Sequence, residues 1–118
     1  LLCGIDDPLA QAETFREAGA GSVGITCGDR GSVLACPAGR YRASAHEVEL
    51  VDGTGGGDAF AAGFVLALLD NSSPEDCLRM GSAAGACCVQ ATGATTGMPD
   101  ADALRRLAAE TPLQITQL

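Results

Sequence analysis

Apolar and polar residues alternate with two different periods along the chain, and these predict a mixture of helices and strands. Asp7 and Pro8 precede apolar residues at near-helical spacing, which predicts a helix over residues 8–18 that ends at glycines. Residues 1–5 are interpreted as the end of a strand or as a loop. Short apolar runs bounded by glycine and proline predict strands at residues 22–26, 32–36 and 40–45 and an extended, strand-like run at residues 47–51.

The second half of the chain predicts three helices. Residues 57–69 are apolar on nearly every side, so we expect this helix to be buried on all faces. A Ser-Pro pair gives a capped start to a helix over residues 74–91, and a last helix runs from residue 99 to about residue 109. The polar segment 91–97 predicts a loop, and the tail at residues 111–118 has no pattern that selects a structure.

Composition and charge narrow the class of protein. The chain has 118 residues, which suggests one domain, and its net charge of −8 argues against nucleic acid or an anionic membrane as a partner. No apolar run is long enough to span a membrane, and no signal peptide is visible. Six cysteines without a Cys-x-x-Cys pair predict buried, reduced thiols in a cytoplasmic protein. The absence of an initiator Met in an apolar start predicts a chain cut from a longer one.

A glycine-rich turn lies between the strand-like run at residues 47–51 and the apolar helix. Glycines leave backbone N–H groups uncovered, and N–H groups at the start of a helix form an anion site that the helix dipole strengthens. Asp58 would stand beside this site, where a carboxylate can take a proton from a hydroxyl. The alternative is an acid that only favours its helix dipole. The turn contains Asp52, Gly53, Thr54, Gly55, Gly56, Gly57 and Asp58.

Two other glycine-loop motifs do not fit these residues. A Walker A loop requires Lys and then Ser or Thr after the last glycine, but Asp58 and Ala59 follow Gly57. A dinucleotide fingerprint requires a third glycine where Asp58 stands, and Asp70 is too near to be its ribose-binding acid. A dinucleotide-dependent oxidoreductase is therefore the weakest of the functions considered.

The run from Asp52 to Asp58 resembles the second signature of the PfkB, or ribokinase-like, carbohydrate kinases, whose usual pattern is Asp-Thr-x-Gly-Ala-Gly-Asp. Gly53 stands where that pattern has Thr, and Gly56 where it has Ala. Both changes loosen the loop. A second segment, residues 25–31, fits the Val-Thr-x-Gly-x-x-Gly turn that lies against ATP in this family; an ordinary hairpin turn is the alternative.

The resemblance implies an α/β fold, the C-terminal part of a ribokinase-like sandwich with helices packed on a central β-sheet. Residues 1–118 would be the nucleotide-binding and catalytic part of a kinase domain truncated at its N-terminus. The implied reaction moves the γ-phosphate of ATP, with Mg²⁺, to a hydroxyl of a sugar or nucleoside. Asp58 would be the base and residues 55–57 the anion hole. The implied nucleotide-binding residues are Thr26, Cys27, Gly28, Asp29, Gly31, Gly57 and Ser82.

A monovalent cation such as K⁺ is a further implication of the resemblance. Its ligands would be loop oxygens at Asp52, Thr54, Cys88, Ala91, Gly93 and Gly97. The alternative is that Asp52 caps the turn and Thr54 caps the helix. Similarly, the small residues around Ser82 suit either an adenine ring or the packing of a neighbouring helix.

A non-catalytic module that binds a nucleotide or a partner is the rival hypothesis. The family's lid and most sugar contacts would precede residue 1, so this chain alone is expected to bind nucleotide weakly and to turn over nothing. The full-length protein is compatible with a homodimer. His46 and Arg30 are expected to be solvated rather than catalytic.

Overall fold

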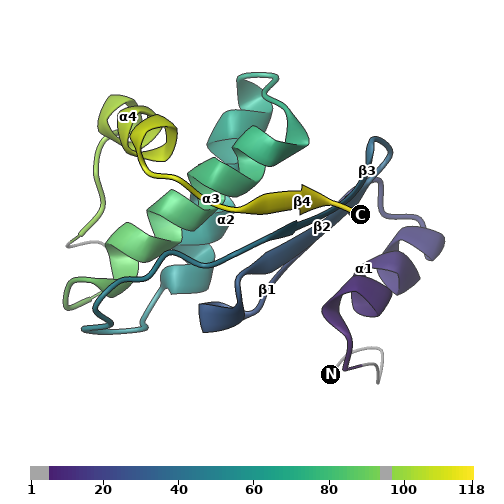
Figure 1. The fold of residues 1–118 in the computed structure, drawn as a ribbon, viewed down its shortest axis with the longest axis horizontal. Coiled ribbons are helices and arrows are strands. Elements are labelled where there is room, and N and C mark those ends of the chain that lie inside the picture. Colours follow the sequence, from purple (N-terminus) through teal and green to yellow (C-terminus); the bar gives the residue numbers. More distant parts are fainter. Residues whose placement is uncertain (1–5, 94–96) are drawn as a thin grey trace. The chain divides into compact units, whose positions relative to one another are not determined.

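The computed structural model describes residues 6–93 and 97–118 (Figure 1). The chain forms two compact units, one made of Leu1–Ala45 with Gln114–Leu118 and the other of His46–Leu113. The prediction for residues 1–5 and the middle of the predicted loop at 91–97 lie outside the described residues. None of the helices in the described part of the chain is both long and apolar enough to cross a membrane.

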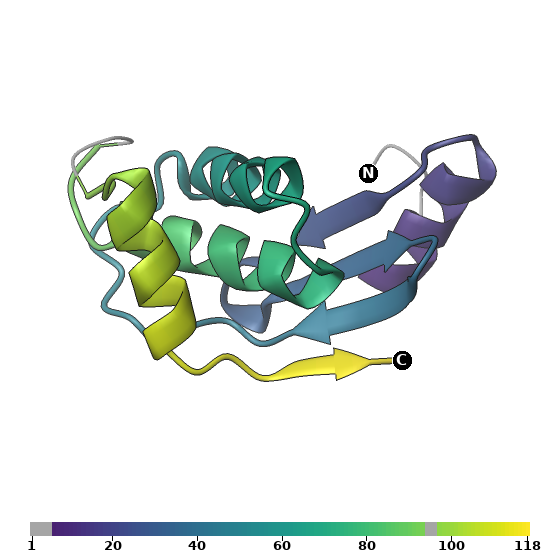
Figure 2. The same cartoon turned by 90° about the horizontal axis from the view of Figure 1, so that it is seen from above.

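The first unit is a sheet with one helix. Its strands lie in the order β1-β2-β3-β4, and each neighbouring pair is antiparallel (Figure 2). Helix α1 packs against β1 and β2. The predicted helix and the first three predicted strands are therefore confirmed. The elements are α1 (Pro8–Glu17), β1 (Val23–Thr26), the 3₁₀ turn η1 (Gly28–Arg30), β2 (Ser32–Cys36), β3 (Gly39–Ala43) and β4 (Ile115–Gln117).

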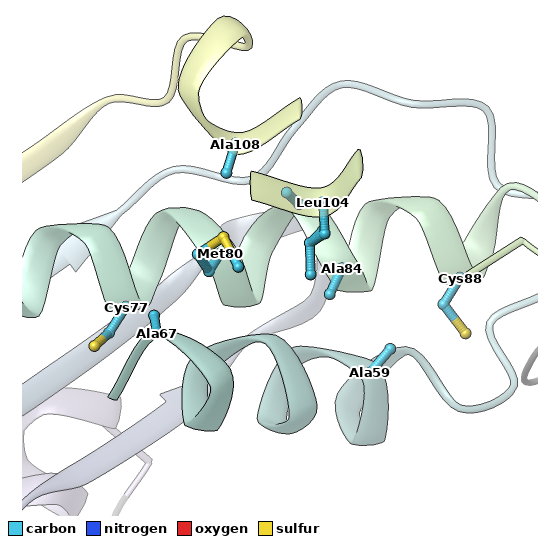
Figure 3. Close-up of a cluster of buried hydrophobic side chains, with 9 residues drawn as sticks. Ala59, Ala67, Cys77, Met80, Ala84, Cys88, Leu104 and Ala108 are labelled. Carbon is cyan, nitrogen blue, oxygen red and sulfur yellow. The ribbon is translucent and has the colours of Figure 1, made fainter. Parts of the chain in front are cut away.

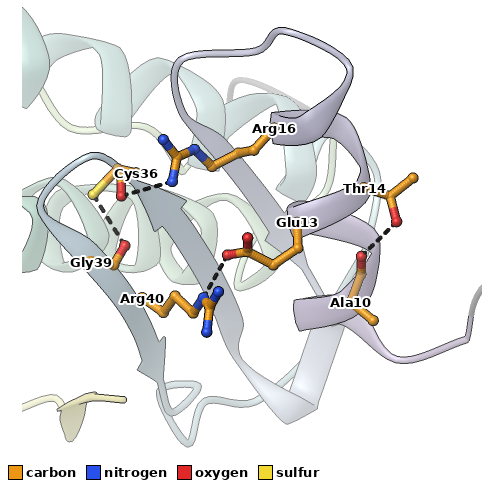
Figure 4. A network of polar contacts seen from close by, with 7 residues as sticks. All are labelled: Ala10, Glu13, Thr14, Arg16, Cys36, Gly39 and Arg40. Atoms are coloured by element: carbon orange, nitrogen blue, oxygen red, sulfur yellow. Dashed lines mark hydrogen bonds and ion pairs between the residues drawn. The ribbon is translucent and has the colours of Figure 1, made fainter.

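Helix α1 is fixed to the sheet by polar contacts as well as by burial (Figure 4). Asp7 caps the helix by accepting a hydrogen bond from the Leu9 amide at 3.3 Å. Arg16 donates to the Cys36 carbonyl at 3.2 Å, and Arg40 pairs with Glu13 at 2.6 Å. Every residue of β2 is buried, so this strand forms the centre of the unit.

The tail supplies a strand that the sequence did not predict. In β4, Ile115 pairs with Ala43 and Gln117 with Tyr41. The Leu118 amide also donates to the Arg40 carbonyl at 2.8 Å. Because β4 pairs along the outer edge of β3, its backbone groups on that side are satisfied by the pairing.

The second unit consists of α2 (Gly56–Leu69), α3 (Pro74–Val89) and α4 (Ala101–Glu110). The three predicted helices are confirmed, with boundaries that differ by one or two residues. Helix α4 begins after Asp100, whose carboxylate accepts from the Ala103 amide at 2.8 Å, rather than at Pro99. Ser73 caps α3 as predicted, since its hydroxyl accepts from the Asp76 amide at 3.2 Å.

Helices α2 and α3 approach each other closely through glycine and alanine, and Figure 3 shows Ala59, Ala67 and Ala84 among the buried side chains between them. A Cβ atom on Gly63 would lie 2.5 Å from the Met80 carbonyl oxygen and 2.9 Å from the Ala84 Cβ. A Cβ on Gly81 would lie 3.0 Å from the Phe60 ring. These glycines are required for the spacing of the two helices. The buried cluster between α2, α3 and α4 contains Ala59, Ala67, Cys77, Met80, Ala83, Ala84, Cys88, Leu104 and Ala108.

The expected burial of α2 is wrong in the described residues. Helix α2 is not buried on all faces: Leu68 is 56% exposed and Leu69 is 76% exposed. Within its unit α2 packs mainly on α3, which covers one face only. The extended run at residues 47–51 pairs with none of the strands β1–β4, and Leu50 is 68% exposed.

None of the described cysteines forms a disulfide, and the prediction that they are all buried is wrong. Cys36, Cys77 and Cys88 are buried, whereas Cys27 and Cys87 are half-buried. Burial raises the pKa of the Cys87 thiol above its ordinary value, with a smaller effect from Cys88. Cys87 is therefore not an activated nucleophile.

Two glycines of the β1–β2 turn provide a test of how this sheet is built. Gly28 (φ 60°) and Gly31 (φ 89°) both have left-handed backbones, but a Cβ on Gly31 would overlap the Ala43 carbonyl oxygen while Gly28 has open space. We expect Gly28→Ala to lower the free energy of unfolding by about 1 kcal/mol and Gly31→Ala by about 3 kcal/mol or more. Urea denaturation measures both. Equal losses would contradict this packing.

Candidate functional site

The glycine loop, defined as residues 52–57, includes the first two residues of α2. Gly55 is the N-cap residue and has a left-handed backbone with φ 78°. A residue with a Cβ would be strained there, so glycine allows the sharp entry into the helix. Asp58 lies in the first turn of α2 and is exposed. The structure thus places an accessible carboxylate at the positive end of a helix dipole.

The backbone amides at this helix mouth are not all equally available. The Gly56 amide already donates to the Gly53 carbonyl, in a long bond of 3.3 Å. The Ala59 amide donates to the Gly55 carbonyl at 2.8 Å, which begins the helical pattern. The amides of Gly57 and Asp58 lie before that bond, where helix geometry offers no partner. They, rather than the amide of Gly56, are the best-placed donors of an anion site.

Space around the loop is open on one side and closed on the other. A Cβ on Gly57 would have no heavy atom within 4 Å, whereas a Cβ on Gly56 would lie 2.9 Å from Cγ1 of Val89. The closed side rests on the end of α3. An anion could therefore approach the loop at Gly57, next to Asp58.

The end of α3 holds the loop through its backbone. The Val89 carbonyl accepts hydrogen bonds from the amides of Val51 (2.8 Å) and Asp52 (3.1 Å). The Cys88 thiol, which is fully buried, donates to the Thr54 carbonyl at 3.4 Å. Val89 is thus a residue of the site that sequence reasoning missed. Its contribution is a main-chain carbonyl, for which the sequence contains no signal.

The residues proposed for a monovalent cation do gather in one place. Asp52 accepts hydrogen bonds from the Thr54 amide (2.9 Å), the Thr54 hydroxyl (2.6 Å) and the Gly93 amide (3.0 Å). The Ala91 amide donates to the Cys88 carbonyl at 3.4 Å. Gly97 packs against the Cys87 carbonyl and the Ala91 side chain.

These contacts agree with the part of the alternative in which Asp52 caps the turn, whereas the N-cap of α2 is Gly55 and not Thr54. Both of its carboxylate oxygens accept hydrogen bonds, and the Thr54 carbonyl already accepts one from Cys88. In the part of the chain that is described, no three His, Cys, Asp or Glu side chains cluster as metal ligands. We therefore assign no chemical step to a cation.

The predicted nucleotide turn belongs to the sheet unit and is well ordered by its own backbone. The Cys27 amide donates to the Gly31 carbonyl at 2.8 Å, and the Gly31 amide donates to the Gly28 carbonyl at 3.1 Å. Thr26, Gly28 and Asp29 are exposed, so a ligand can reach them. Gly31 is buried, and its glycine is explained by packing rather than by ligand contact.

Ser82, Arg30 and His46 lie outside the glycine loop. Ser82 is half-buried on α3, which leaves both interpretations of this helix open. Arg30 is exposed, as expected for a turn residue. His46 is half-buried, and burial lowers the pKa of its imidazole below the ordinary value, so it is predominantly neutral at pH 7.

Comparison with known proteins shows the family to which the chain belongs. The family model described as pfkB family carbohydrate kinase matches residues 3–101. The chain belongs to the pfkB family of carbohydrate kinases. The chain is 32% identical over 106 residues to the ATP-dependent 6-phosphofructokinase of Thermoanaerobacterium thermosaccharolyticum. The matched stretch covers 90% of this chain and 33% of the relative. The chain is 47% identical over 72 residues to the acarbose 7(IV)-phosphotransferase of an Actinoplanes species, covering 59% of this chain and 23% of the relative.

Solved structures of pfkB-type kinases share the fold. Ribokinase from Arabidopsis thaliana, complexed with ribose and ATP, superposes with a TM-score of 0.77 at 33% identity, covering 87% of this chain and 34% of that chain. Ribokinase from Thermotoga maritima gives a TM-score of 0.76 at 30% identity, covering 85% and 34%. The α/β, ribokinase-like fold predicted from the sequence is confirmed. The chain spans about a third of the length of these relatives.

The contact between Gly56 and Val89 explains how this pfkB-type loop departs from the family pattern. Because a Cβ at position 56 would lie 2.9 Å from Val89, we expect Gly56→Ala to lower the free energy of unfolding by about 1 kcal/mol. Combining Gly56→Ala with Val89→Ala should remove the clash. A double-mutant cycle should therefore give a coupling energy of about 1 kcal/mol between the two positions. Gly57→Ala, in open space, is the matched control and should be neutral or stabilising. Equal effects at positions 56 and 57 would contradict this.

The Asp52 carboxyl predicts a pH dependence of stability. The Thr54 hydroxyl, the Gly93 amide and the Thr54 amide lower its pKa to about 2. Because the folded pKa lies below the unfolded value of about 3.9, this carboxylate stabilises the fold above about pH 4 and loses its contribution as the pH falls toward 2. A ¹³C NMR titration should give a midpoint near 2, and a midpoint near 4 would contradict the hydrogen bonds.

Proposed function

We propose that this chain carries the phosphate-handling site of an ATP-dependent carbohydrate kinase. In this proposal Asp58 takes the proton of a substrate hydroxyl while that oxygen attacks the γ-phosphate of ATP. The amides of Gly57 and Asp58 donate to the transferring phosphoryl group, and the dipole of α2 adds to their effect. The observation that carries the proposal is the exposed Asp58 in the first turn of α2, beside open space at Gly57.

The activity is proposed for the protein that contains this chain, because the chain spans about a third of its relatives. The relatives support ATP as the donor, since one is a phosphofructokinase described as ATP-dependent and another is a ribokinase solved with ribose and ATP. The acceptor is proposed as a sugar or nucleoside hydroxyl, and the residues of this chain do not select one. Residues 1–118 alone are expected to bind nucleotide weakly and to show no turnover.

Mg²⁺ is proposed to accompany ATP. This ion keeps several waters and is usually held through the phosphates of the nucleotide, so it does not require a cluster of protein carboxylates. The exposed Thr26, Gly28 and Asp29 of the β1–β2 turn are proposed to border the nucleotide, as the resemblance implies. A K⁺ dependence of turnover remains a prediction of that resemblance.

Replacement of Asp58 by Asn tests the proposal. The variant keeps the shape of the side chain but removes the base, so kcat should fall by about 10²–10⁴-fold while the affinity for ATP stays within about threefold. The experiment requires the intact protein that carries this chain, with a screen of sugars and nucleosides as acceptors and ADP release as the readout.

Asp70→Asn is the matched control, since Asp70 is an exposed carboxylate at the opposite end of the same helix. It should leave kcat within about twofold of the wild type. If Asp58→Asn turned over as fast as Asp70→Asn, the proposed kinase chemistry would be wrong and a non-catalytic nucleotide-binding or partner-binding module would be favoured.

A further inference from the structure

The first two turns of α2 contain a single large apolar side chain. Between Gly53 and Gly63, every residue except Thr54, Asp58 and Phe60 is glycine or alanine. Small residues let helices approach closely, but only a large side chain buries enough apolar surface to hold one helix end firmly on another. Phe60 is therefore the side chain that can anchor the mouth of α2, and it lies two positions after Asp58.

Phe60 packs on two glycines of α3 that lie one turn apart, Gly81 and Gly85, which we call the glycine hollow. A Cβ on Gly81 would lie 3.0 Å from Cζ and 3.1 Å from both Cε atoms of the Phe60 ring, so the tip of the ring points at this glycine. A Cβ on Gly85 would lie 3.7 Å from Cβ of Phe60. Because residues four apart share a helix face, the Phe60 side chain runs along one face of α3 from Gly85 to Gly81.

The glycine hollow also contacts the backbone of the first turn of α2. A Cβ on Gly85 would lie 3.3 Å from the Gly56 carbonyl oxygen, so this carbonyl rests on the bare backbone of Gly85. The Gly56 carbonyl and the Gly57 amide belong to the same planar peptide unit. The position of Phe60 and Gly56 on α3 therefore sets the direction of the Gly57 N–H group.

Phe60 and Asp58 point in nearly opposite directions from the axis of α2. With 3.6 residues per turn, residues two positions apart are separated by about 160° around a helix axis. Phe60 is half-buried, whereas Asp58 is exposed. Fixing the ring in the glycine hollow thus fixes the rotation of α2 at which the Asp58 carboxylate faces away from α3.

We infer that Phe60 is a positioning residue, whose ring fixes the rotation of α2 on the glycine hollow and so aims Asp58 and the Gly57 amide at the open space beside Gly57. The inference rests on the proposed roles of Asp58 and of this amide. Phe60 does not touch the reacting groups in this assignment. Its effect on the reaction is large because a misplacement of about 1 Å in a reacting group can lower a rate about 100-fold.

Kinetics of the intact protein that carries this chain test the role with two leucine variants. Phe60→Leu keeps an apolar side chain but leaves the space next to Gly81 empty, so kcat should fall about tenfold or more with KM for the acceptor within about twofold. Phe64→Leu is the matched control, because Phe64 is half-buried one turn further along α2 with its ring centroid 6.2 Å from that of Phe60. It should keep kcat within about twofold of the wild type.

Amide signals of the ligand-free intact protein report the same role without any assay of activity. In ¹⁵N NMR spectra, Phe60→Leu should shift the signals of Gly57 and Asp58, whereas Phe64→Leu should leave both in place. A loss of core packing that did not rotate α2 would lower the stability of both variants without moving these two signals.

A methyl group at position 81 should have opposite effects on the two backgrounds. Gly81→Ala alone presses on the Phe60 ring and should lower kcat, and it covers the case in which Phe60→Leu fails to fold. Added to Phe60→Leu, the same methyl refills the glycine hollow and should recover part of the lost kcat.

The outcomes separate this inference from the proposed function. Unchanged kcat in Phe60→Leu, an equal loss in Phe64→Leu, or unmoved signals of Gly57 and Asp58 would overturn the positioning role. If Phe60→Leu does not fold, unchanged kcat and signals in Gly81→Ala would overturn it. Failure of the proposed function shows separately, as full turnover in Asp58→Asn.

Discussion

The close approach of α2 and α3 is the constraint on which the rest of the helical unit depends. Gly63 lets the Met80 carbonyl come within contact distance, and Gly81 leaves room for the Phe60 ring. Side chains at those glycines would push the helices apart. Because the start of α2 lies beside the end of α3, this spacing also brings Gly56 against Val89 and places the glycine loop within hydrogen-bonding reach of the Val89 carbonyl.

The site follows from that packing rather than from the loop alone. A glycine-rich turn is flexible in isolation, but here its backbone is bonded to Val89 and Cys88 and its aspartate to Gly93. Preorganised donors stabilise developing charge without the cost of rearranging during the reaction. Asp58 stays accessible because it lies one residue beyond open space at Gly57. The loop thus combines a restrained backbone with an accessible carboxylate at Asp58.

The positions of the helices and of the first three strands were predicted from the sequence, whereas the pairing of β4 and the burial of α2 were not. Caps at Asp7 and Ser73 and turns at glycine are local signals, and the structure uses them as expected. The strand β4 was missed because its pairing with β3 involves residues more than 70 positions apart. Likewise, the apolar composition of α2 gave no indication that only one of its faces is covered within the unit, since coverage depends on neighbours.

For the site, the sequence identified the loop, Asp58 and Asp52 but not how they are held. The departure from the family pattern at Gly56 was visible, but its physical reason, the Val89 side chain, becomes apparent only when α3 is in place. The alternative that Asp52 caps the turn was considered and matches the hydrogen bonds to Thr54. No sequence pattern reports a backbone acceptor such as the Val89 carbonyl, because every residue has one.

The central claim is that the mouth of α2 is a preset anion site. An ¹⁵N NMR titration of residues 1–118 with ATP, and separately with inorganic phosphate, tests it most directly. The account predicts that the amide signals of Gly57 and Asp58 shift in both titrations, while signals of α4 stay in place. Unchanged signals for these two amides when other residues show binding at saturation would contradict it.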